Sequence, residues 1–250
     1  MGRGVRVIAA AVLLAAFTVA TSAQHSVAPD AHGLERILPT LDEGDARAMN
    51  EMLRGTAGHE RRWTQRPHLV VVTTVMAFAN GSHEQEFAAV DAEVPDEDAR
   101  QLVDDLTAGL TLLSGRTFEH FASVRFEHPS AGAQVRVARA GEIVVGRFRG
   151  VRAALAAVGY GGRTSRADGT ITSGTVMLDE DYDSRDRLRN LLRMHELGHA
   201  LGYNHVESQR SIMNPTLGVE PTDFDRKVAR LAFSHLTPDT PRPLLLAIGR

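Results

Sequence analysis

The sequence contains no cysteine in its 250 residues. This absence excludes a disulfide framework, thiolate metal ligands and a lipid-modified N-terminal cysteine. It also excludes a cysteine that could occupy a metal site and keep it inactive. An exported chain of this length can dispense with disulfides because its core is large enough, and exported proteins poor in cysteine are typical of bacteria.

A strong positive charge is also missing. Lys and Arg number 28 against 31 Asp and Glu, which gives a formal net charge of -3. Nucleic-acid-binding proteins usually carry a basic face or stripe, so this balance gives no reason to expect a nucleic-acid partner. Hydrophobic residues make up 43% of the chain and charged residues 24%, a composition typical of a folded domain with a sizeable core.

The uncharged N-terminal run is too short for a comfortable membrane span. It extends over 14 residues, from Val7 to Ala20, whereas a transmembrane helix needs about 20 apolar residues. Two arginines precede the run and small residues follow it up to Ala23. This pattern predicts a cleaved signal peptide over residues 1–23 and an extracytoplasmic or secreted protein, held at a membrane only if the segment stays uncleaved.

The rest of the chain divides into three predicted parts. Residues 24–66 are mixed in character, with a helix-like stretch at 34–53 broken at Pro39, and are interpreted as an N-terminal extension or a pro-segment. Residues 67–238 form the main domain, and 239–250 form a tail. Strands alternating with helices in the main domain predict an α/β or α+β fold.

The main domain opens with a strand expected to be covered on both faces, because residues 68–78 are rich in β-branched side chains without polar alternation. A helix is expected from Pro95 to Leu113, ended by Gly115. Further strands are expected near residues 121–127, 133–139, 142–149 and 170–178, with Asp168-Gly169 as a hairpin turn.

A second helix is predicted from Ser184, as the N-cap, to Gly202. His195 and His199 are four positions apart, so both imidazoles project from one face, a spacing that suits two ligands of a single Zn²⁺. The arginines of this helix, Arg189 and Arg193 among them, are expected to form a solvated face.

The residues around these histidines complete a pattern of catalytic type. Glu196 follows the first histidine and can lie beside a metal-bound water as a general base. Gly202 permits a sharp turn after the helix, which allows His205 to become a third ligand. A fourth position left open for water distinguishes a catalytic zinc site from a structural one.

Three other interpretations stay open on the residues alone. A downstream glutamate such as Glu220 could be the third ligand in place of His205. The chain could be a secreted zinc-binding module without catalysis that recognises a peptide or a surface partner. The same arrangement of zinc, water and glutamate could hydrolyse an amide that is not a peptide.

The segment HELGHALGYNH, with Ser211-Ile-Met-Asn-Pro215 after it, resembles the metzincin zinc metallopeptidases, and its Met-x-Pro sequence resembles their matrixin-like branch. The resemblance implies a twisted, mostly parallel five-stranded sheet above an active-site helix, with a small helical C-terminal subdomain. It also implies an edge strand near residues 156–163, Met213 beneath the zinc, and Pro215 in the wall of a specificity pocket.

The resemblance further implies a zinc endopeptidase that acts as a monomer on an extended peptide or protein, with zinc held by His195, His199 and His205. Val206 departs from the serine usual after the third histidine in animal matrixins, and the segment that binds a second zinc and calcium there has no match. Calcium at the acidic run 179–183 is the weaker expectation, because acidic loops are more often merely solvated.

Overall fold

The computed structural model describes residues 42–55, 58, 60–78, 86–185 and 187–234. The predicted signal peptide, the break at Pro39 and the tail lie outside them. None of the helices in these ranges is long and apolar enough to cross a membrane. The elements in chain order are α2 Glu43–Arg54, β1 His68–Phe78, β2 Glu86–Glu93, α3 Asp96–Leu113, β3 Val124–Glu127, β4 Gln134–Arg136, β5 Glu142–Arg149, α4 Val151–Leu155, β6 Gly159–Ser165, β7 Ile171–Asp179, α5 Glu180–Arg185, α6 Arg189–Leu201 and α7 Asp223–Phe233.

β1 is the central strand of the sheet and is buried on both faces, as the sequence predicts. Leu69 and Val71 belong to one apolar core, whereas Val70 and Val72 belong to a second core on the opposite face. This division follows from the strand geometry, in which successive side chains point to opposite faces. The unbroken β-branched run is therefore the signature of a strand between two layers.

The sheet has seven strands in the order β4-β2-β1-β5-β7-β6, with β3 paired to β1 beside this path. β1, β5 and β7 run parallel, as do β1 and β3, whereas β2, β4 and β6 join by antiparallel pairs. The implied α/β fold is confirmed, with a mixed sheet whose pairs β1–β3, β1–β5 and β5–β7 are parallel, although the sheet has seven strands and not the implied five. One edge of β1 accommodates both β3, opposite Leu69–Val72, and β2, opposite Thr74–Phe78.

β2 was not predicted from the sequence. Its segment EFAAVDAE contains three alanines and one β-branched residue, so local preference for a strand is weak. Pairing with β1 on one side and β4 on the other forms the strand, and Phe87 and Ala89 are buried against the second core. Tertiary contacts therefore form this strand, because the intrinsic strand preference of its own residues is weak.

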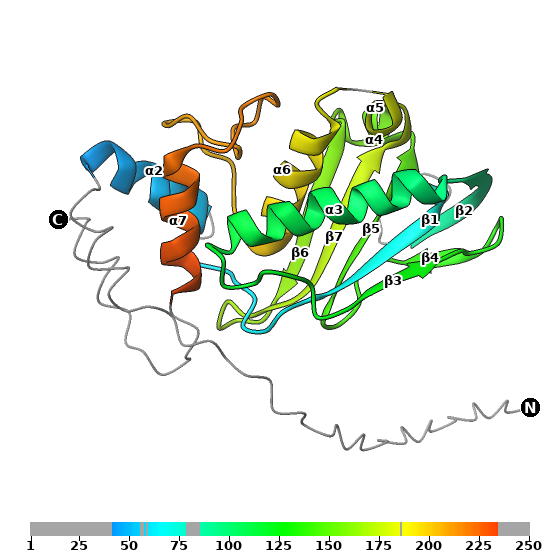
Figure 1. Ribbon diagram of the computed structural model, residues 1–250, viewed down its shortest axis with the longest axis horizontal. Coiled ribbons are helices and arrows are strands. Elements are labelled where there is room, and N and C mark those ends of the chain that lie inside the picture. Colours follow the sequence, from blue (N-terminus) through cyan, green and yellow to red (C-terminus); the bar gives the residue numbers. More distant parts are fainter. Residues whose placement is uncertain (1–41, 56–57, 59, 79–85, 186, 235–250) are drawn as a thin grey trace, which may run out of the picture.

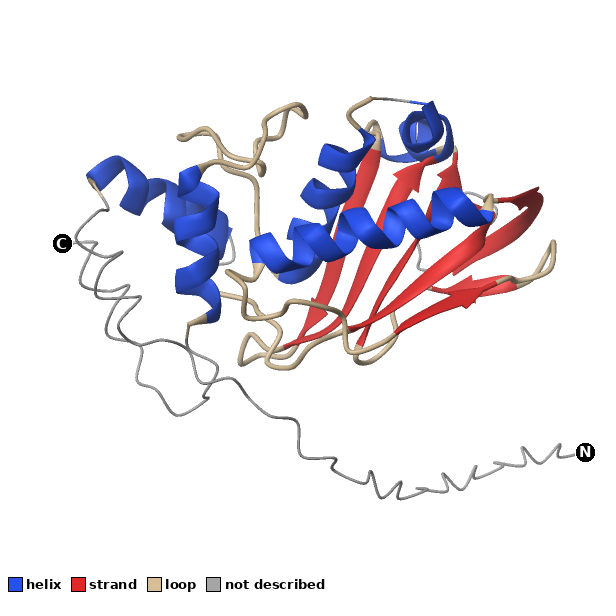
Figure 2. Cartoon of the chain, viewed as in Figure 1, coloured by secondary structure: helices blue, strands red, loops and turns tan. Residues whose placement is uncertain are grey.

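α3 and α6 cover the same face of the sheet, and α2 and α7 lie together beside its β6 edge (Figure 1; Figure 2). α3 presents its apolar side inward, with Leu102, Leu106, Leu110 and Leu113 all buried. α7 begins with a complete capping box between Thr222 and Asp225. The helical layer therefore encloses the larger core, and α6 contacts α3 as well as the strands β6 and β7.

The predicted single helix from Ser184 to Gly202 is two helices. The side chain of Asp179 accepts a hydrogen bond from the Tyr182 amide at 3.1 Å, which caps a first helix, α5, from Glu180. Ser184 lies within α5 and caps nothing. α6 starts at Arg189, after Leu188, whose carbonyl accepts the amides of Leu191 and Leu192.

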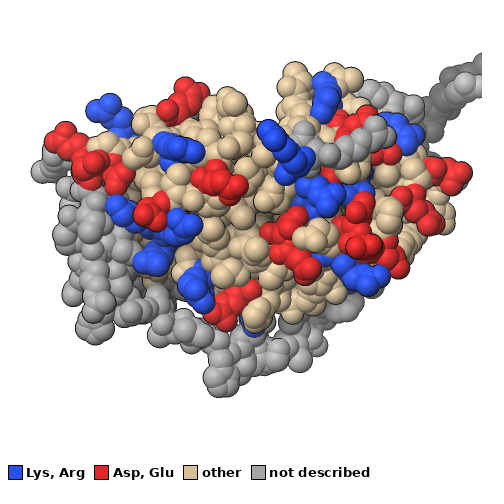
Figure 3. Space-filling view, turned by 45° about the horizontal axis from the view of Figure 1, so that its top comes forward, with Lys and Arg blue, Asp and Glu red and all other residues tan. Residues whose placement is uncertain are grey.

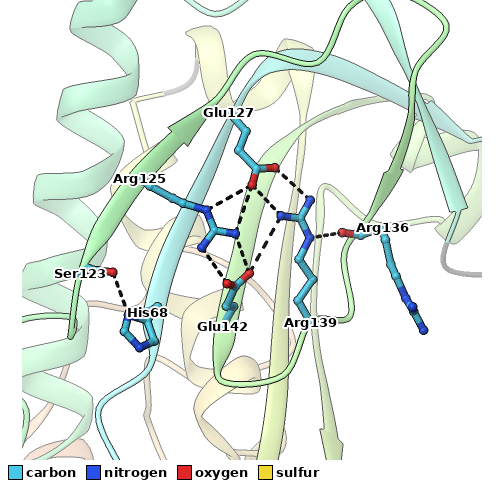
Figure 4. Close-up of polar contacts among 7 residues, drawn as sticks. All are labelled: His68, Ser123, Arg125, Glu127, Arg136, Arg139 and Glu142. Carbon is cyan, nitrogen blue, oxygen red and sulfur yellow. Dashed lines mark hydrogen bonds and ion pairs between the residues drawn. The ribbon is translucent and has the colours of Figure 1, made fainter. Parts of the chain in front are cut away.

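An ion-pair network ties β3 to the start of β5 across β1 (Figure 4). Arg125 donates to Glu142 at 2.6 Å and to Glu127 at 3.1 Å, and Arg139 donates to Glu127 at 2.7 Å. Hydrogen bonds from Arg139, followed by those from Arg125, lower the pKa of Glu127 against the opposing effect of burial. Positive and negative side chains are likewise interspersed on the face that Figure 3 shows.

Candidate metal centre

Three imidazoles converge at the C-terminal end of α6. The Nε2 atoms of His195, His199 and His205 lie 3.1 to 3.3 Å from one another. Tetrahedral zinc with Zn–N bonds of about 2.05 Å separates its nitrogen ligands by about 3.3 Å. The triangle therefore has the dimensions of three zinc ligands, and it is the metal-binding group found among the described residues.

Two of the three imidazoles are oriented through their other nitrogen. His195 Nδ1 lies 2.7 Å from the Ile212 carbonyl and His199 Nδ1 lies 2.9 Å from the Tyr203 carbonyl. A carbonyl oxygen only accepts, so each Nδ1 carries the proton and each Nε2 keeps a free lone pair. Lone pairs directed at one point repel unless a cation lies between them, which is the arrangement of a metal-ligating histidine.

The protonation of the histidines agrees with this chemistry. Burial lowers the pKa of His199 to about 3, and it also lowers the pKa values of His195 and His205. The imidazoles are therefore neutral near pH 7, which is the form that binds metal. His195 is buried, His199 is half-buried and His205 is exposed, so the centre opens to solvent on the side of the third histidine.

Gly202 makes the turn that the sequence predicts. It follows the last residue of α6 with a φ of 122°, where L side chains are rarely found. A Cβ at this position would also lie 2.1 Å from the carbonyl oxygen of Arg61. Glycine is thus required both for the turn and for the close approach of the N-terminal segment, and the turn directs the chain back to His205.

Glu196 lies next to the histidine triangle but points toward β6. Its side chain is buried, and burial raises its pKa to about 8, while a hydrogen bond from the Gly161 amide acts in the opposite direction. A carboxyl group with a raised pKa beside a cluster of metal ligands has the properties of a general base. The structure therefore brings together all four chemically active residues that the sequence singles out.

The edge strand β6 approaches α6 so closely that only glycine fits. A Cβ at Gly161 would lie 2.1 Å from the Glu196 carbonyl oxygen and 2.6 Å from His199 Cβ. A Cβ at Gly159 would lie 2.6 Å from the carboxylate of Glu196. β6 is the predicted edge strand, shifted from residues 156–163 to 159–165, and it pairs antiparallel with β7.

Gly161→Ala is expected to reduce activity and to destabilise the protein by about 1–3 kcal/mol, because the added methyl group must push β6 away from α6. Urea unfolding and kcat/KM for a peptide substrate measure the two effects. Gly162→Ala is the matched control, since the three atoms nearest to its Cβ would all belong to the end of the exposed Tyr160 side chain, the first at 2.7 Å. Equal losses in the two variants would contradict the argument.

Met213 lies beneath α6. Its side chain is fully buried, and its Sδ would be 2.4 Å from a Cβ at Gly198, so the sulfur packs directly on the helix backbone between the first two histidines. The Met213 carbonyl accepts the Val206 amide at 3.0 Å, which links the methionine turn to the residue after His205. Pro215 follows the turn and is exposed.

Asp225, which was not predicted from the sequence, fixes this turn. The fully buried carboxylate accepts hydrogen bonds from Ser211 Oγ and, at 3.1 Å, from the Ile212 amide. The Ile212 carbonyl in turn orients His195. The signal available was the spacing Thr222-x-x-Asp225, a capping box, although nothing local indicated that Asp225 also faces the turn.

Arg193 does not belong to a solvated face, so that prediction was wrong. Its side chain is fully buried and donates to Asp183 at 2.6 and 2.8 Å and to Asp105 at 2.7 Å. Asp183, also fully buried, accepts a further hydrogen bond from Arg147 at 2.8 Å. The spacing of residues within α6 could not predict the burial of Arg193, because its acidic partners, Asp105 and Asp183, lie in α3 and α5.

The acidic run 179–183 is mostly paired with arginines, not merely solvated as expected. Glu180 pairs with Arg149 at 2.9 Å, and Asp183 belongs to the buried network. Carboxylates already engaged by guanidinium groups have fewer oxygens free for a cation. Calcium therefore stays an untested expectation for this run.

Comparison with known proteins agrees with the geometry. The family model described as Matrixin matches residues 124–229, a range that runs from β3 into α7 and contains the three histidines, Glu196 and Met213. No curated protein matches the chain. Over the matched residues the chain is similar to the matrixins, and the match supports a matrixin-like metzincin, a family of zinc metallopeptidases.

Proposed function

We propose that the protein is an exported zinc endopeptidase that hydrolyses peptide bonds in extended substrates. The observation that supports this most directly is the triangle of Nε2 atoms with the buried Glu196 beside it. His195, His199 and His205 would hold one zinc ion, with Met213 and Gly202 as structural support. Export follows from the predicted signal peptide, residues 1–23.

The chain's own residues can perform the steps of the reaction. Zinc, when bound, supplies a Lewis acid that polarises the scissile carbonyl and lowers the pKa of a coordinated water. Glu196, which is buried next to the three histidines, would accept the proton of that water and pass it to the leaving amine. The exposed edge of β6 can pair with an extended substrate through main-chain hydrogen bonds.

Incubation of the purified protein with casein and with a peptide library tests this proposal. Cleavage that a zinc chelator abolishes and added zinc restores is the expected result. Zinc binding without chelator-sensitive cleavage would instead support the second interpretation, a zinc-binding module that recognises a peptide or a surface partner. Activity on small amide substrates, with none on peptides, would support a non-peptide amidase.

His205→Ala is expected to lose most of its zinc, whereas Glu220→Ala is expected to keep it. His205 Nε2 lies within 3.3 Å of both other ligand atoms, and Glu220 is exposed and absent from the metal-binding group. Metal analysis after dialysis, with a chelator competition, measures the difference. Zinc loss in Glu220→Ala with retention in His205→Ala would assign the third ligand to the glutamate.

A further inference from the structure

The loop that carries His205 is held from outside the matched domain. Residues 203–209 follow α6, and the N-terminal helix α2 lies against them. The Met52 carbonyl accepts the backbone amide of Asn204 at 2.8 Å and its side-chain amide at 3.1 Å. Asn204 is the residue directly before the proposed third ligand, so α2 fixes the backbone that positions His205.

Glu51 fixes the other side of the same histidine. Its carboxylate accepts the Glu207 amide at 2.8 Å and the Ser208 hydroxyl at 2.6 Å. Burial opposes the charged form of Glu51, but these hydrogen bonds outweigh it and lower the pKa. The carboxylate is therefore ionised near pH 7, the state in which such bonds are strongest. His205 thus lies between two stretches of backbone that α2 holds.

β6 holds Asn204 from the opposite direction. Arg163 donates to the Asn204 side-chain oxygen at 2.8 Å and to the carbonyls of His199 and Tyr203 at 2.9 and 3.2 Å. The Asn204 side chain therefore bridges β6 and α2, accepting from one and donating to the other. Because the side-chain oxygen and nitrogen of Asn204 are both hydrogen-bonded, this side chain has little rotational freedom. The backbone at His205, the next residue, is restricted as a result.

The packing of α2 is that of a core element. Ala48, Met49 and Met52 are fully buried within the larger core. The segment after α2 is equally integrated, because Trp63 is buried and donates its indole N–H to the Ala200 carbonyl of α6 at 3.0 Å. Removal of α2 would expose these apolar side chains and leave the amides of Asn204 and Glu207 without their partners.

We propose that residues 43–54 are a permanent part of the active protein, not a removable pro-segment, and that Glu51 is a positioning residue for the third metal ligand. The proposal rests on the proposed function in that His205 is taken as a zinc ligand. Groups that orient metal ligands commonly change metal affinity by 10- to 100-fold when they are removed.

The first test measures zinc affinity in the full mature protein by competition with a chromogenic chelator. Glu51→Ala is expected to raise the Kd for zinc about tenfold, and Glu51→Gln to raise it less, because an amide oxygen can still accept one hydrogen bond. Glu43→Ala is the matched control, since it removes an exposed carboxylate from the first turn of the same helix. The melting temperature of each variant is recorded in parallel.

A lower melting temperature for Glu51→Ala with an unchanged zinc Kd would show that the residue only stabilises the fold, and would overturn its positioning role. Zinc affinity is measured without a peptide substrate. A protein that binds zinc through Glu51-dependent positioning but cleaves nothing would therefore contradict the proposed function and leave this inference intact.

The second test is N-terminal sequencing of the mature, active species as its host secretes it. The expected N-terminus lies before Glu43. An active species that begins after Arg54 would overturn the proposal, because the whole of α2 would then be dispensable.

Discussion

Glu196→Gln is expected to lower kcat by about 10³-fold or more while the zinc content stays unchanged. The substitution keeps the shape of the side chain and one oxygen that can accept the Gly161 amide, but removes the group that takes a proton from water. General base catalysis of this kind contributes about 10²–10⁴-fold. Steady-state kinetics on a cleaved peptide, with metal analysis of the same sample, measure both quantities.

The fold of this variant should survive. Burial raises the pKa of Glu196 to about 8, so folding of the zinc-free chain at pH 7 forces the carboxylate to take up a proton, and a neutral amide removes that cost. The melting temperature of zinc-free Glu196→Gln is therefore expected to be no lower than that of the parent. Full activity in this variant would remove Glu196 from the mechanism.

Asp183→Ala is expected to destabilise the protein by about 3–5 kcal/mol, the cost of leaving buried charges without their partner. Asp183 and Arg193 are both fully buried, and Asp183 also accepts from the buried Arg147. Removal of the carboxylate leaves both guanidinium groups in the interior, where, among the described residues, Arg193 still pairs with Asp105 and Arg147 with Asp98. Urea unfolding of the zinc-free protein measures the loss without a contribution from metal binding.

Glu180→Ala provides the control for this experiment. Glu180 lies in the same short helix, α5, and pairs with Arg149, but the two side chains are 30% and 56% exposed. An exposed ion pair stabilises a protein by about 1 kcal/mol or less. Similar losses in the two variants would show that the buried network has no special role. Since Arg193 lies two residues before His195 in α6, the network also fixes the part of the helix that precedes the first histidine.

The parts of the site that sequence could predict are those that depend on local spacing. His195 and His199 share a helix face because they are four positions apart, and Gly202 marks the turn because of its freedom at positive φ. β1 was predictable for a similar reason, since a long β-branched run with no polar alternation is typical of a strand between two layers.

The parts that sequence could not show depend on pairing between distant segments. Asp225 looks like an ordinary helix-capping residue until α7 places it against the methionine turn. Arg193 has the spacing of a solvated side chain, but the acids that neutralise it come from α3 and α5. β2 could not be predicted because it depends on pairing with β1 and β4, not on its own residues.

The metal centre combines a short ligand segment with long-range anchors. The three histidines lie within eleven residues, yet Tyr203 donates its hydroxyl to the Leu113 carbonyl, 90 positions away, and Asn204 reaches Met52, 152 positions away. Contacts between segments so far apart form slowly, because closing long loops costs chain entropy before any contact is gained. We therefore expect the nascent chain to offer two helical ligands early and to complete its metal geometry only late in folding. Zinc added to the refolding protein should then bind in a weak phase and a tight phase, the second as slow as folding itself.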